Sequence, residues 1–117
     1  AAPEPHPAMQ TLTTAAELDD LLQRPIALLY KHSTRCPISA AAHEEVRAYV
    51  EAYPDAPVWL LDVNAQRALS DSVVARTGVD HHSPQAILLV GGRAAWSASH
   101  FDVRFEALER KLAEAGA

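Results

Sequence analysis

Residues 25–39 read PIALLYKHSTRCPIS, and this stretch decides the fold. The run from Ile26 to Tyr30 is short and apolar, which is typical of a buried strand. From Pro37 onward, apolar residues recur at helical spacing, at Ile38, Ala42, Val46, Tyr49, Val50 and Tyr53. The only cysteine, Cys36, therefore falls where a strand passes into a helix, directly before a proline suited to the first helical position.

The surroundings of Cys36 predict a reactive thiolate. The first turn of a helix has amides without acceptors and a partial positive charge, and both stabilise an anion. Lys31, His32 and Arg35 add positive or potentially positive charge nearby. Ser39, in the first turn, is placed to donate a hydroxyl hydrogen bond to the sulfur. A lone cysteine is often a buried apolar residue, but this segment is polar, so we expect a nucleophile with a lowered pKa.

Composition narrows the class of protein. The chain has 117 residues, a net charge of −5, 49% hydrophobic residues and one cysteine. That length predicts one domain with an ordinary core, and the acidic balance argues against nucleic-acid binding. One cysteine allows no intramolecular disulfide. No apolar segment is long enough for a membrane span, and we expect residues 1–8 not to be a signal peptide, because they lack an apolar core. We expect a cytoplasmic protein without a membrane partner.

The start of the chain divides into two parts. Residues 1–10 contain three prolines and are expected to form a flexible N-terminal arm, with the folded domain over residues 11–117. Thr14 and Glu17 match a capping box, which opens a helix that ends before Pro25.

A second strand and a third helix follow the helix after Cys36. Residues 58–61 are a continuous apolar run, typical of a strand buried on both faces. Asn64 is expected to cap the third helix, in which Leu69 and Val73 share a face. Gly78 is expected to end it.

The last part of the chain predicts a hairpin and a closing helix. Gly91-Gly92 would join an apolar strand at residues 86–90 to a fourth strand at residues 93–98, and Asp102 would cap the last helix. The order is then α-β-α-β-α-β-β-α, with parallel strands across the helical crossover and an antiparallel hairpin. We predict an α/β protein of thioredoxin-like fold, with a small mixed four-stranded sheet and helices on both faces.

Two positions resemble the thioredoxin-like proteins. These proteins place a nucleophilic cysteine at the start of the helix that follows the first core strand. They place a cis-proline just before the third core strand, where it faces the cysteine. The resemblance assigns those positions to Cys36 and Pro84 and implies a cis Ser83–Pro84 bond. More closely, the chain resembles the monothiol bacilliredoxins over roughly residues 11–115, through the segments at residues 31–42, 67–70, 83–85 and 96–100.

The bacilliredoxin resemblance implies a thiol-disulfide oxidoreductase in redox homeostasis, one that removes bacillithiol from S-bacillithiolated proteins. Cys36 would attack the mixed disulfide and keep the bacillithiol until an external low-molecular-weight thiol releases it. A bacillithiol disulfide reductase would recycle the product indirectly. Ser39 stands where dithiol relatives have their second cysteine. Bacillithiol would be a co-substrate, and neither a tightly bound cofactor nor a metal is expected.

The same resemblance suggests which residues surround Cys36. Bacillithiol carries a malate unit, and Lys31 and Arg35, with His32 as a further candidate, would donate to its carboxylates. The backbone of Ser83, held by Pro84, would pair with the peptide-like part of the substrate. The residues expected to bind substrate or stabilise the thiolate are Lys31, Arg35, Thr34, Pro37, Ser39, Ser83 and Pro84.

Other functions stay open at this point. Two copies of Cys36 and two small thiols could hold a [2Fe–2S] cluster, as in monothiol glutaredoxins, although Pro37 stiffens the turn. A catalytically idle adaptor with a vestigial Cys36 is a second alternative. A thiol peroxidase or arsenate reductase would lack a resolving cysteine. The six histidines do not have zinc-ligand spacing, so His81 and His82 are expected to be structural or solvated.

Overall fold

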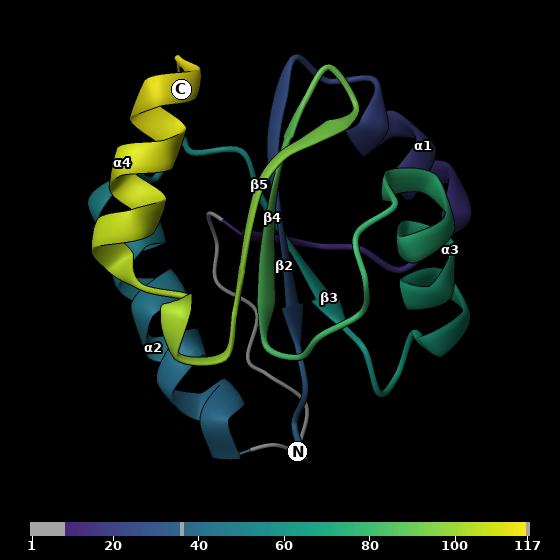
Figure 1. Ribbon diagram of the computed structural model, residues 1–117, viewed down its shortest axis with the longest axis horizontal. Coiled ribbons are helices and arrows are strands. Elements are labelled where there is room, and N and C mark those ends of the chain that lie inside the picture. The colour runs from purple at the N-terminus through teal and green to yellow at the C-terminus, as the bar shows by residue number, and fades with distance from the viewer. Residues whose placement is uncertain (1–8, 36, 117) are drawn as a thin grey trace.

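The computed structural model describes residues 9–35 and 37–116. Its central sheet lies between two pairs of helices (Figure 1). Helices α2 and α4 cover one face, and α1 and α3 cover the other. The elements are β1 Met9–Thr11, α1 Ala15–Leu22, β2 Ile26–His32, α2 Pro37–Ala52, β3 Val58–Asp62, α3 Arg67–Thr77, β4 Gln85–Val90, β5 Arg93–Ser99, the 3₁₀ helix η1 His100–Asp102 and α4 Phe105–Ala115.

Strand β2 is the centre of the sheet, whose order is β1-β3-β2-β4-β5. It runs parallel to β3, as a helical crossover requires, and antiparallel to β4. The hairpin of β4 and β5 is antiparallel. The predicted strand directions are therefore confirmed, and the carboxyl ends of β2 and β3 meet at one edge of the sheet.

The described sheet has five strands, and the prediction of four was wrong. The additional strand, β1, pairs in parallel with β3, with Met9 opposite Val58. It takes in Met9 and Gln10, which the sequence analysis placed in the arm. Three residues are too few to show an alternating pattern, so the strand depends on tertiary pairing with β3. The arm itself stays a prediction, because residues 1–8 lie outside the described residues.

The core consists of two clusters, one on each face of the sheet. One lies between the sheet and helices α2 and α4, and the other between the sheet and helices α1 and α3. Strand β2 contributes to both, because alternate side chains point to opposite faces. Leu28 and Tyr30 face the first cluster, and Ala27 and Leu29 face the second. This double burial anchors the strand that leads to residues 33–35, the segment directly before Cys36, which we call the cysteine loop.

Two of the predicted helix ends are confirmed. The Thr14 hydroxyl accepts a hydrogen bond from the Glu17 amide at 3.1 Å, and the Glu17 carboxylate accepts one from the Thr14 amide at 3.0 Å. Gly78, with a φ of 73°, ends α3 in the left-handed conformation. None of the helices in the described ranges is long and apolar enough to cross a membrane.

Two predicted helix caps were wrong. Helix α3 begins after Gln66, which makes no side-chain cap, because the Asn64 side chain is engaged by the cysteine loop instead. Helix α4 begins after Arg104 rather than at Asp102, which lies in η1. In both places the loop contains one more turn than the sequence pattern shows.

Candidate functional site

Cys36, the predicted nucleophile, lies outside the described residues, but the elements before and after it are placed. Strand β2 ends at His32 and helix α2 begins at Pro37, so the sequence position of the cysteine falls between strand and helix, as predicted. Arg35 is exposed. The lowered thiol pKa and the role of Cys36 stay predictions.

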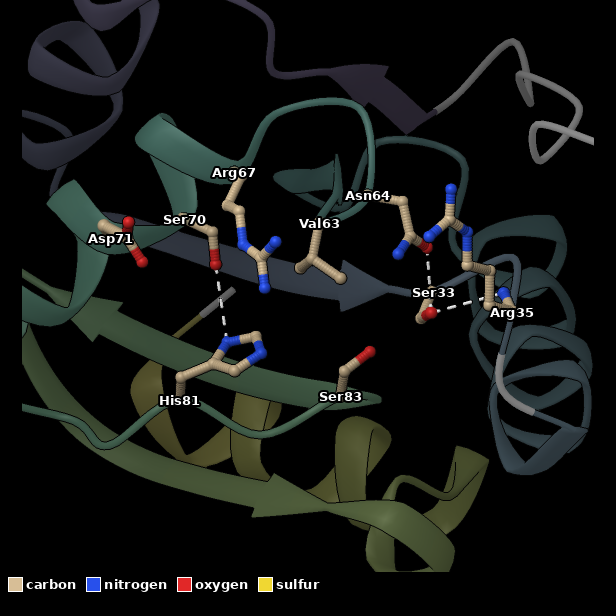
Figure 2. A pocket seen from close by; sticks show the side chains of 9 residues that line it. All are labelled: Ser33, Arg35, Val63, Asn64, Arg67, Ser70, Asp71, His81 and Ser83. Carbon is tan, nitrogen blue, oxygen red and sulfur yellow. Dashed lines mark hydrogen bonds between the residues drawn. The ribbon is translucent and has the colours of Figure 1, made fainter.

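Asn64, just after β3, holds the loop that precedes Cys36. Its Oδ1 accepts hydrogen bonds from the Ser33 hydroxyl at 2.9 Å and from the Thr34 amide at 3.1 Å. The Ser33 hydroxyl in turn accepts the Arg35 amide at 3.2 Å (Figure 2). Because β2 and β3 are parallel, their carboxyl ends bring Asn64 and Ser33 together. This chain of bonds fixes the backbone as far as the residue directly before Cys36.

Ser39 holds the same loop from the side of α2. Its side chain is fully buried, and its Oγ accepts a hydrogen bond from the Ser33 amide. The distance between the two atoms, 3.4 Å, is long for a hydrogen bond. Its predicted hydrogen bond to sulfur involves Cys36 and stays a prediction. Thr34 is engaged through its amide with Asn64, and Pro37 is exposed at the first position of α2.

The Ser83–Pro84 peptide bond is cis, as predicted. It precedes β4, whose first residue, Gln85, pairs with Lys31 near the end of β2. The Pro84 carbonyl accepts the His100 amide at 2.9 Å, which ties the turn to the end of β5. The Ser83 hydroxyl is buried without a hydrogen-bond partner among the described residues. Pairing between the Ser83 backbone and a substrate stays a prediction.

A cavity of about 330 Å³ lies between the cysteine loop, α3 and the segment before Pro84 (Figure 2). Arg35 lines it on the side of the cysteine loop, and Arg67 reaches into it from the start of α3. Asp71 lies one helical turn beyond Arg67. Among the described residues, the lining consists of Ser33, Arg35, Val63, Asn64, Arg67, Ser70, Asp71, His81 and Ser83. The described lining thus carries two guanidinium groups, on Arg35 and Arg67, and one carboxylate, on Asp71, so positive charge predominates in the cavity.

Lys31 stands behind this cavity and does not line it. The side chain is fully buried, and its Nζ lies 3.3 Å from Nδ1 of His81, which also lies 3.4 Å from the Ser70 hydroxyl. Burial lowers the pKa of Lys31 to about 8, partly offset by the charge of Asp71. At neutral pH the ammonium is therefore mostly protonated and donates to His81. The structure thus places the Lys31 ammonium against His81, and its predicted hydrogen bond to a substrate carboxylate stays a prediction.

His32 does not supply the positive charge that the sequence suggested. Burial, together with the neighbouring His43, lowers its pKa to about 4, against a smaller opposing effect of Asp62, so the ring is neutral at pH 7. Its Nδ1 is hydrogen-bonded to the Tyr30 hydroxyl at 2.8 Å, and its ring centroid lies 4.6 Å from that of His43. The exposed cation nearest to Cys36 in the sequence is therefore Arg35.

Sequence reasoning missed Arg67, His81 and Asn64 as site residues. The motif that begins at Arg67 was noted as a family likeness, but no role was inferred for that side chain. His81 was expected to be structural or solvated, and Asn64 to be a helix cap. Their proximity to the cysteine loop depends on strand pairing, and the only signal was that each follows a predicted strand or precedes Pro84.

The described residues contain no group of three or more His, Cys, Asp or Glu that could hold a metal ion. An iron–sulfur cluster shared by two copies would involve Cys36, so that alternative is not tested.

Comparison with known proteins places this geometry in a family. A sequence model of the monothiol bacilliredoxin BrxC family matches residues 10–108. A solved structure described as a proposed oxidoreductase with a thioredoxin fold is 29% identical, has a TM-score of 0.81, and aligns over 94% of this chain and 95% of its own.

Thioredoxins share the fold at lower identity. A variant thioredoxin from Halobacterium salinarum is 19% identical, with a TM-score of 0.73, 98% of this chain covered and 97% of the other. Oxidised mitochondrial thioredoxin 3 from Saccharomyces cerevisiae is 17% identical, with a TM-score of 0.69 and coverages of 92% and 95%. The thioredoxin-like fold is thus confirmed. With the family match extending over most of its length, the chain belongs to the monothiol bacilliredoxin family BrxC.

Proposed function

We propose that this protein is a thiol-disulfide oxidoreductase that removes bacillithiol from S-bacillithiolated proteins, with Cys36 as the nucleophile. The observation that carries the proposal is the place of the only cysteine. In the sequence it follows Arg35, which lines the cationic cavity, and precedes Pro37, which begins α2. Membership of the bacilliredoxin family supports bacillithiol as the co-substrate.

The first step is a thiol-disulfide exchange. The Cys36 thiolate attacks the bacillithiol sulfur of the mixed disulfide, and a new sulfur–sulfur bond forms as the bond to the target cysteine breaks. The target cysteine leaves as a thiolate and takes a proton from water. The target is thereby reduced, and Cys36 carries the bacillithiol.

The second step needs a thiol from outside. With one cysteine in the chain, and a serine at position 39, no internal thiol can resolve the intermediate. A second bacillithiol, as its thiolate, attacks the bacillithiol sulfur bound to Cys36. Bacillithiol disulfide leaves, and the Cys36 thiolate is regenerated.

The described residues support this chemistry by placing the loop. Asn64 and Ser33 fix the backbone up to Arg35 through the hydrogen bonds described above. The amide end of α2 and the Arg35 guanidinium favour an anionic sulfur. His32, neutral at pH 7, contributes no charge. We therefore expect Arg35 and the helix to account for most of the thiolate stabilisation.

The test is catalytic turnover. A test protein with one S-bacillithiolated cysteine is incubated with excess bacillithiol near pH 7, with and without the enzyme. We expect release of the target thiol at a rate proportional to enzyme concentration, with one bacillithiol disulfide formed per thiol released. The matched control is Cys36→Ser, which should give the uncatalysed rate. Equal rates for wild type and Cys36→Ser would overturn the proposal in favour of a catalytically idle adaptor.

A further inference from the structure

We propose that the cavity lined by Arg35, Arg67 and His81 binds the anionic end of the low-molecular-weight thiol, and that Arg67 sets the preference for a thiol carrying carboxylates. This inference rests on the proposed function, because it names the part of the molecule that would recognise the co-substrate. It adds a specificity residue on α3, outside the cysteine loop.

The size and position of the cavity fit the tail of a small thiol. Its volume of about 330 Å³ is at the lower end of small-molecule sites. Arg35, at one side, is the residue directly before Cys36, and Ser70 and Asp71 lie on α3 beyond Arg67. A thiol whose sulfur is engaged at Cys36 would therefore direct the rest of its structure toward α3.

The charge of the cavity selects for an anion. Among residues 9–35 and 37–116, no carboxylate lies within ion-pair distance of Arg35 or Arg67, whereas the Arg76 guanidinium is paired with Asp19 at 2.7 Å. A guanidinium can hold a carboxylate through two parallel hydrogen bonds. This cationic site belongs to a chain of net charge −5, so it does not follow from the average composition.

The buried Lys31 makes the site more favourable for an anion, although it does not line the cavity. Its ammonium donates to Nδ1 of His81, so His81 carries its proton on Nε2, which is left as a further donor. Asp71, the carboxylate in the lining, interacts electrostatically with both Lys31 and His81, so the buried ammonium offsets its charge. The Ser83 hydroxyl, which is buried and has no hydrogen-bond partner in the part of the chain that the structure describes, offers one more polar contact.

The first experiment compares two substrates, one that carries the malate unit with its carboxylates and one that does not. The second-order rate constant of Cys36 is measured with an aryl disulfide of bacillithiol and with the same disulfide lacking the malate unit. We expect the wild type to prefer the malate-bearing disulfide by about tenfold, and Arg67→Gln to lose most of that ratio. The matched control is Arg93→Gln, an exposed arginine at the opposite end of the sheet, which should keep the ratio within about twofold.

The second experiment does not depend on exchange chemistry. S-methyl bacillithiol is titrated into Cys36→Ser and into the double variant with Arg67→Gln, and binding is followed by amide NMR shifts. We expect shifts at the cavity residues, about tenfold weaker binding in the double variant, and weaker binding at high salt. Shifts elsewhere, or equal affinities, would overturn the inference.

The two experiments separate the inference from the proposed function. Exchange by the wild type without a preference for the malate-bearing disulfide would refute this site and leave the oxidoreductase standing. Binding in the cavity that depends on Arg67, without any exchange, would support the site and refute the oxidoreductase.

Discussion

Replacing Lys31 by methionine should stabilise the protein at neutral pH. Burial lowers the Lys31 pKa from 10.5 to about 8, which corresponds to a cost of about 3 kcal/mol for the charged side chain in the folded state. Methionine has a similar length and no charge. Losing the hydrogen bond to His81 destabilises the variant by about 1 kcal/mol. We therefore expect the free energy of unfolding of Lys31→Met to exceed that of the wild type by about 2 kcal/mol at pH 7.

The pH dependence gives the sharper test. The unfolded chain keeps the Lys31 proton up to about pH 10.5, whereas the folded protein releases it near pH 8. The cost is therefore full below pH 8 and disappears as the pH rises to 10.5. Wild-type stability should rise relative to Lys31→Met by about 3 kcal/mol over that interval.

The assay is urea unfolding of both proteins between pH 7 and pH 10.5, so that the titration of other groups cancels in the difference. Lys111→Met, at the other lysine of the chain, is the control, because Lys111 is partly exposed and paired with Glu114. Its stability should lie within about 1 kcal/mol of that of the wild type at pH 7. A difference between wild type and Lys31→Met that does not change with pH would refute the reasoning.

Three further predictions concern other parts of the structure. Asn64→Ala should destabilise the protein by about 1–3 kcal/mol in urea unfolding and slow thiol-disulfide exchange at Cys36. Asn64→Asp keeps the accepting oxygen and should retain most of the stability and most of the exchange rate. Equal losses in the two variants would contradict the role of Oδ1. The His32 ring, with its pKa lowered to about 4, should show no NMR titration between pH 8 and pH 5, and a titration midpoint near pH 6.5 would contradict this assignment. The free energy of unfolding should fall as the pH drops from about 6.5 toward 4, because the unfolded state binds the proton first. Gly91→Ala should cost about 1 kcal/mol for its positive φ, and Gly92→Ala about 3 kcal/mol in thermal or urea unfolding, because its Cβ would lie 2.5 Å from the Leu22 carbonyl oxygen; similar costs for both would rule out the clash.

Features with a local cause could be predicted from the sequence. The capping box at Thr14 and the left-handed end at Gly78 need only a few neighbouring residues. The buried strands could be predicted because their apolar runs are continuous. The cis bond before Pro84 has no such local signal and was predicted from the resemblance to the thioredoxin-like proteins. These signals were sufficient for the fold, apart from the three-residue strand β1.

The candidate site was only partly predictable, because its residues meet through tertiary contacts. Arg67 and His81 lie on α3 and before β4, and neither is near Cys36 in the sequence. Asn64 looked like a helix cap because asparagine serves both helix ends and loops through the same side-chain oxygen. The burial of Lys31 could have been inferred, since it continues the apolar run of β2.

The most direct test of the central claim is the intact mass of the protein after one turnover. The wild type is mixed near pH 7 with an S-bacillithiolated test protein, without free bacillithiol to resolve the intermediate. The account predicts that the chain gains one bacillithiol through a disulfide at Cys36, in step with release of the target thiol, and that Cys36→Ser gains none. An unchanged mass for the wild type, with the test protein still bacillithiolated, would contradict it.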